Sequence, residues 1–168
     1  MFWLSCVLGA ARPSGWFVGL VFEIAAAFKA GDHLSTFGGD PISCAAALAN
    51  VHFMEKENLP ARATETGNYA MTKLRALQKQ YPIIGDIRGL GLMIGVELVK
   101  DEKLTPTTSE AEAIRDALLR NGVLVGVGGV YGNVIRFQPP LIITHQQIDQ
   151  AIDAFAVALQ EAAQPAAV

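Results

Sequence analysis

Helical and strand-like patterns of apolar residues alternate along most of this 168-residue sequence, with no internal repeat and no low-complexity linker. Apolar residues three and four apart indicate helices, and strict alternation of apolar and polar residues indicates strands. The predicted elements are helices over 41–57, 61–81 and 107–121, strands over 92–99, 123–127 and 133–138, and a closing helix after residue 144. This order predicts one α/β unit.

The spacing of apolar residues also predicts which face of several elements is buried. In the first strand, alternation places Ile94, Val96 and Leu98 on one face and Met93 and Glu97 on the other. The closing helix carries an apolar stripe, which is expected to lie in the core. Its members are Ile148, Ile152, Phe155 and Leu159.

The predicted helix boundaries rest on capping and helix-breaking residues. Ser109 with Glu112, and Thr144 with Gln147, match the capping-box spacing at the start of the last two helices. The helix over 41–57 is apolar on most of its circumference, as expected of a helix buried between layers. The residues expected to end it are Asn58 and Pro60.

Composition limits the class of partner. Hydrophobic residues make up 51% of the chain and charged residues 17%, with a formal net charge of −3 and a mean hydropathy of +0.31. A chain of this length can bury about two-thirds of its unfolded surface. The absence of a basic stripe argues against nucleic acid as a partner. The excess of apolar residues suggests that a partner surface is missing.

The apolar stretch over residues 1–11 could be mistaken for a signal peptide. No Lys or Arg precedes it, and the stretch beyond it is interrupted by Arg12, Pro13 and Gly15. These flanks favour neither a secretion signal nor a transmembrane span, so we expect no membrane association. Export remains the weaker alternative.

The cysteines and histidines are scattered. Cys6 and Cys44 form no C-x-x-C or metal-ligand spacing, which is typical of a protein from the reducing cytoplasm and does not indicate zinc. His33, His52 and His145 occur singly and are assigned no metal role.

A possible anion site lies within residues 31–47. Asp40 can cap a helix and Pro41 suits its first turn, so backbone N–H groups and the positive end of the helix dipole would lie beside Ser35 and Thr36. A phosphate would fit there. The alternative is an ordinary Gly-Gly turn that leads into a capped helix.

Two glycine clusters do not match a dinucleotide-binding motif. The cluster that starts at Gly89 has Ile94 where the third glycine is required, and the cluster that starts at Gly126 has Tyr131 there. Neither leads from a strand directly into a helix. Rossmann-type nucleotide binding is therefore not predicted.

A charged residue interrupts the apolar strand over 133–138. Arg136 needs a partner there, and a guanidinium binds a carboxylate through two parallel hydrogen bonds. Such a contact would fix the position and orientation of an amino acid substrate. The alternative is a structural salt bridge to one of the sixteen acidic side chains.

Residues 35–41 read Ser-Thr-Phe-Gly-Gly-Asp-Pro, residues 88–98 read Arg-Gly-Leu-Gly-Leu-Met-Ile-Gly-Val-Glu-Leu, and residues 133–141 read Asn-Val-Ile-Arg-Phe-Gln-Pro-Pro-Leu. In this order they resemble class III pyridoxal-phosphate aminotransferases, the family of the ω-amino acid, ornithine and alanine–glyoxylate type enzymes. The family usually has Asn at the position of Asp40. A carboxylate there would repel a phosphate by roughly 1 kcal/mol in a solvated site.

Residues 4–15 resemble the stretch that begins at the catalytic lysine of this family. Gly9, Pro13 and Gly15 match, but the lysine position falls on Cys6. A thiol cannot form the imine through which transamination runs. The resemblance therefore provides no catalytic residue in this chain.

The resemblance implies the small domain of a fold-type I transferase, with helices packed on a small, mostly antiparallel sheet. It implies that 1–40 is a remnant of the large cofactor-binding domain and that 41–168 is a connecting helix and the C-terminal small domain. The implied cofactor is pyridoxal 5′-phosphate (PLP), contacted by Thr36 and Ser35. The implied substrate-binding residue is Arg136.

The activity implied by the resemblance is transfer of an amino group from an amino acid or amine to a 2-oxo acid, in a homodimer. We expect the chain by itself to be inactive, because Cys6 occupies the lysine position and most of the large domain is missing. The alternative is a non-catalytic interaction module that docks on a full-length relative.

Overall fold

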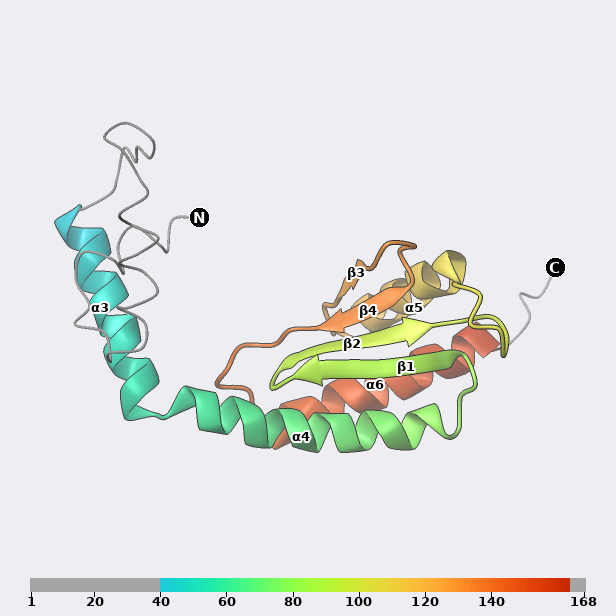
Figure 1. Ribbon diagram of the computed structural model, residues 1–168, viewed down its shortest axis with the longest axis horizontal. Helices are drawn as coiled ribbons and strands as arrows, with labels where there is room; N and C mark the ends of the chain where they lie inside the picture. Colours follow the sequence, from blue (N-terminus) through green and yellow to red (C-terminus); the bar gives the residue numbers. More distant parts are fainter. Residues whose placement is uncertain (1–39, 164–168) are drawn as a thin grey trace. The chain divides into compact units, whose positions relative to one another are not determined.

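The computed structural model describes residues 40–163 (Figure 1). The chain divides into two compact units between Asn58 and Leu59. Helix α3 (Pro41–Lys56) belongs to the first unit, and all the other described elements belong to the second. The boundary that the resemblance implies between residues 40 and 41 stays a prediction.

Helix α3 begins as predicted but is not buried. The Asp40 carboxylate accepts a hydrogen bond from the Ser43 N–H at 2.9 Å, and Pro41 lies in the first turn. The predicted burial is wrong, because none of the residues of α3 is buried. Its apolar side chains surround the helix, so burial would require cover on several sides. No other described element belongs to this unit to supply that cover.

Helix α4 (Leu59–Gln78) begins earlier than predicted. Asn58 has a φ of 46°, and the helix starts at the next residue with Pro60 in its first turn. Proline is tolerated there because N–H groups of the first turn have no acceptor within the helix. Pro60 therefore opens α4 instead of ending α3, and Tyr81 lies beyond the end of the helix.

Four strands form one antiparallel sheet in the order β1-β2-β4-β3. They are β1 (Ile84–Leu90), β2 (Met93–Leu98), β3 (Gly126–Gly128) and β4 (Val134–Phe137). The sequence did not predict β1, because Gly85 and Gly89 weaken its strand pattern. The strand predicted over 123–127 is shorter and begins only at Gly126.

Three helices cover one face of this sheet. They are α4, α5 (Thr108–Arg120) and α6 (His145–Ala163) (Figure 1). Ile94, Val96 and Leu98 of β2 point into the core that these helices share, while Met93 is 66% exposed on the other face. The predicted alternation and the predicted packing of helices on a small antiparallel sheet are confirmed. We call the other face the open face.

Helix α5 begins within one residue of its predicted start, but its capping residues differ from the predicted pair. Thr107 is the N-cap, and its hydroxyl donates a hydrogen bond to the Glu110 carboxylate. The predicted pair of Ser109 and Glu112 is therefore wrong by two residues. The pairs Thr107–Glu110 and Ser109–Glu112 both have the capping-box spacing, but the Thr107 N–H donates to the Leu98 carbonyl at the end of β2. This contact places the N-cap at Thr107.

Helix α6 begins with the predicted capping box. The Thr144 N–H donates to Gln147 Oε1 at 3.0 Å, and the Gln147 N–H donates to Thr144 Oγ1 at 3.2 Å. The predicted apolar stripe is buried in the core. It comprises Ile148, Ile152, Phe155 and Leu159. None of the helices within residues 40–163 is long and apolar enough to cross a membrane.

Candidate carboxylate-binding site

One row of four residues crosses the open face of the sheet. Arg88 of β1 lies opposite Gly95 of β2. Gly95 in turn lies opposite Arg136 of β4, which pairs with Gly126 of β3. Residues directly opposite one another in antiparallel strands share a face. The two arginines therefore project from the same face, with only a glycine between them.

The Arg136 side chain lies over strand β3, where two glycines leave room for it. Arg136 is exposed and follows the buried Ile135 on β4. A Cβ added at Gly126 would lie 3.0 Å from Arg136 Nη2, and one added at Gly128 would lie 3.2 Å from Nε. A side chain at either position would crowd the guanidinium. The glycine cluster that failed as a nucleotide motif thus forms the surface on which Arg136 rests.

The Arg136 guanidinium makes no ion pair with any carboxylate of residues 40–163. The structural salt bridge that the sequence left as an alternative is therefore not formed within the described chain. A guanidinium that makes no ion pair has a rigid fork of N–H donors to offer, and this fork matches the two oxygens of a carboxylate. The arrangement is suited to binding a carboxylate ligand.

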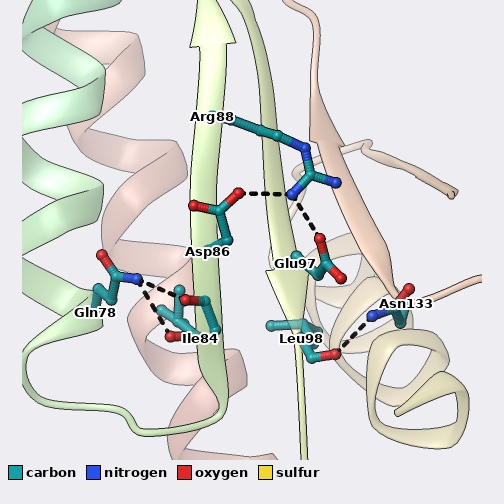
Figure 2. Close-up of polar contacts among 8 residues, drawn as sticks. Gln78, Ile84, Asp86, Arg88, Glu97, Leu98 and Asn133 are labelled. Carbon is teal, nitrogen blue, oxygen red and sulfur yellow. Dashed lines mark hydrogen bonds and ion pairs between the residues drawn. The ribbon is translucent and has the colours of Figure 1, made fainter. Parts of the chain in front are cut away.

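The second arginine of the row is paired with two carboxylates. Arg88 Nη1 lies 2.7 Å from Asp86 Oδ2 and 2.5 Å from Glu97 Oε2 (Figure 2). These hydrogen bonds, first to Asp86 and then to Glu97, hold the pKa of Arg88 above its ordinary value. Sequence reasoning missed this trio. The spacing of Asp86 and Arg88 by two residues would have placed both on one strand face, had β1 been recognised.

The strand that carries Arg136 is anchored at its start by a buried asparagine. Asn133 is 2% exposed, and its Nδ2 donates to the Leu98 carbonyl at 2.8 Å (Figure 2). The Leu98 N–H donates in return to the Asn133 carbonyl at 2.8 Å. Buried hydrogen bonds of this kind define the strand register. They fix which residue of β4 lies beside Gly95.

The core provides a second support for β4. Phe137 contacts Phe155 of α6 edge to face, with ring centroids 5.4 Å apart. A hollow of about 470 Å³ opens beside it on the helix side of the sheet, with Leu74, Ile94 and Ile152 among its lining residues. Arg136 points to the opposite face. The candidate site is therefore an open surface and not this apolar hollow.

The predicted phosphate-contacting residues Ser35 and Thr36 lie outside the described residues, as does Cys6. The nearest described position is Asp40. Its carboxylate accepts the Ser43 N–H, and this hydrogen bond holds the pKa of Asp40 below its ordinary value. A charged carboxylate thus occupies the helix end at which the sequence placed a phosphate. The predicted phosphate contacts of Ser35 and Thr36 stay a prediction.

Comparisons with known proteins identify the family. The model of the family described as "Aminotransferase class-III" matches residues 15–159. The mitochondrial alanine–glyoxylate aminotransferase 2 homolog 2 of Arabidopsis thaliana is 45% identical over 133 residues, covering 79% of this chain and 28% of that protein. The predicted cytoplasmic location stays a prediction, since this relative is named as mitochondrial.

Two solved structures share both fold and sequence with this chain. An aminotransferase of Bacillus anthracis is 34% identical with a TM-score of 0.75, covering 83% of this chain and 34% of its own. An amine transaminase from an uncultivated Pseudomonas species, solved in its PLP-bound form, is 34% identical with a TM-score of 0.71, covering 77% and 30%.

The matches cover most of this chain but only a part of each relative. The chain spans between 28% and 34% of the length of these three proteins. The described elements therefore correspond to a fragment of the fold-type I aminotransferase fold, and the cofactor of that family is PLP. The chain belongs to the class III aminotransferase family.

Proposed function

We propose that this chain provides the substrate-carboxylate site of a PLP-dependent transaminase, with Arg136 as the residue that binds the carboxylate. The substrates would be an amino acid donor and a 2-oxo acid acceptor. The observation that carries the proposal is the exposed guanidinium, which rests on Gly126 and Gly128 and pairs with no carboxylate of residues 40–163.

Arg136 would act by binding and orienting the substrate. Two parallel hydrogen bonds from a guanidinium fix both the place and the plane of a carboxylate, which a single ammonium does not. PLP supplies the electron sink for amino transfer in this family. Ser35 and Thr36 remain proposed contacts of its phosphate, and a homodimer remains the proposed assembly.

The proposal is tested by titrating the ¹⁵N-labelled chain with pyruvate, a small 2-oxo acid. We expect amide shifts at residues 126–128 and 134–137. Arg136→Ala should weaken binding at least tenfold, because charge-assisted hydrogen bonds contribute about 1.5–3 kcal/mol. Arg136→Lys should lie between the two, since it keeps the charge but not the fork.

Two controls make this test specific. Arg115→Ala removes an equal charge from an exposed arginine of α5, which pairs with Asp116 at 2.8 Å, and should bind pyruvate like the original chain. The neutral amide of pyruvate should not produce the shifts. Binding that survives Arg136→Ala, or that centres away from β3 and β4, would contradict the proposed function.

We further propose that the chain alone does not catalyse transamination. With PLP, L-alanine and glyoxylate, the purified 168-residue chain should yield no glycine above background, because Cys6 offers no amine for covalent attachment of the cofactor. A full-length class III aminotransferase assayed alongside is the positive control. Cofactor-dependent turnover by the purified chain would overturn this proposal.

A non-catalytic module that docks on a full-length relative is the second candidate function. The observation that favours it is the exposure of apolar residues on α3, where Ile42 is 81% exposed and Phe53 is 46% exposed. Size-exclusion chromatography of the chain mixed with a full-length class III enzyme distinguishes the candidates. A stable complex supports docking, and a monomer that elutes unchanged counts against it.

A further inference from the structure

Glu97 occupies a position between the two arginines of the open face. It lies diagonally from Arg88, because Arg88 pairs with Gly95 two residues earlier on β2. It also lies diagonally from Arg136, because Glu97 pairs with Val134. Diagonal neighbours of an antiparallel pair lie about 7–8 Å apart, within reach of long side chains. Either guanidinium can therefore reach the Glu97 carboxylate.

A second carboxylate makes the position of Glu97 depend on Arg88. Asp86 lies directly opposite Glu97, and like charges directly opposite one another are destabilising. Arg88 Nη1 bridges them, at 2.7 Å from Asp86 and 2.5 Å from Glu97 (Figure 2). Without this bridge, repulsion from Asp86 would push Glu97 away from β1. On the β4 side, Arg136 lies diagonally from Glu97.

We propose that Arg88 is a positioning residue, which keeps Arg136 available to a ligand by holding Glu97 on the β1 side of the sheet. Gly95 has no side chain, and its neighbour Val134, whose Cγ1 would lie 3.2 Å from a Cβ added at Gly95, is apolar and offers Glu97 no competing charge. This inference rests on the proposed function of Arg136, because it concerns competition between Glu97 and a substrate carboxylate. Arg88 itself contacts no substrate.

The proposal predicts an effect that a second substitution reverses. Arg88→Ala should weaken pyruvate binding about fivefold, the upper range for a competing surface ion pair. Arg88→Ala combined with Glu97→Gln should restore the original affinity, because the competing charge is gone. Arg115→Ala is again the matched control for loss of one positive charge. A merely structural role of Arg88 would not be rescued by Glu97→Gln.

A readout without ligand keeps the inference testable on its own. In a crystal structure of the Arg88→Ala variant, the Glu97 carboxylate should lie within 4 Å of the Arg136 guanidinium. If that variant does not fold, Arg88→Met, which keeps the aliphatic stem, is used for the same measurement. Glu97 remaining on the β1 side, or a double variant as weak as Arg88→Ala, would overturn the role of Arg88.

The two proposals fail in different ways. If Arg136→Ala leaves pyruvate binding unchanged, or if the original chain does not bind pyruvate, the proposed function of Arg136 is wrong, while the Glu97 position in the variant structure still decides whether Arg88 holds it. If Arg136→Ala abolishes binding but Arg88→Ala does not weaken it, only the positioning role is overturned.

Discussion

Gly67→Ala should destabilise the folded chain by about 2 kcal/mol, although alanine is the better helix former. In an exposed helix the same change would stabilise by about 1 kcal/mol. Gly67 lies within α4 and is buried, and a Cβ there would lie 2.1 Å from the carbonyl oxygen of Gly91. The obstacle is backbone, which cannot rotate away as a side chain can. Overpacking of this kind typically costs about 1–3 kcal/mol, so the clash outweighs the propensity.

Urea denaturation of the original chain and of the Gly67→Ala variant gives the free energy of unfolding of each. The measurement shows whether the substitution lowers or raises this free energy. Asn68→Ala, at the exposed neighbouring position of α4, is the matched control and should be neutral or slightly stabilising. A Gly67→Ala variant that is as stable as the original would show that α4 and the turn at Gly91 do not pack as closely as the structure shows.

Phe155→Ala should lower the free energy of unfolding by about 3–5 kcal/mol, the range for a large aromatic side chain removed from a packed core. Phe155 of α6 is fully buried and contacts Phe137 edge to face. Domains of this size are stable by only about 5–15 kcal/mol, so the loss is a large part of the total. Because Phe137 follows Arg136 on β4, pyruvate binding should weaken as well.

Thermal and urea unfolding of the Phe155→Ala variant measure the first effect, and the pyruvate titration measures the second. Val157→Ala on the same helix is the control, since Val157 is 43% exposed and should change stability by less than about 0.5 kcal/mol. A loss of stability equal to that of Val157→Ala would contradict the central place of Phe155 in the core.

Two of the predicted site features require positions that the structure does not describe. Ser35 and Thr36 as phosphate contacts, and Cys6 at the lysine position, therefore stay predictions. Arg136 is described, and its strand was recognisable as a short apolar run that one charged residue interrupts. The chemistry of an isolated arginine in an apolar strand pointed to a carboxylate before the strand's neighbours were known.

Local periodicity determined the parts of the fold that the sequence predicted correctly. The stripe on α6 and the alternation on β2 each lie within a single segment, and each pattern repeats at the period of its own element. The capping box of Thr144 and Gln147 is likewise complete within four residues. Such features can be predicted without knowing what packs against them, because the spacing of apolar residues within one segment indicates which face is buried.

Only the tertiary structure decided the rest, because it depends on segments that are far apart in the chain. Pairing of Gly95 with Arg136 joins β2 to β4, and a shift of one residue would have turned Arg136 to the core. The close approach of Gly67 to Gly91, and the bridge from Arg88 to Glu97, arise only once α4, β1 and β2 have packed. Residue types and periods specify elements, whereas register and packing specify which side chains meet.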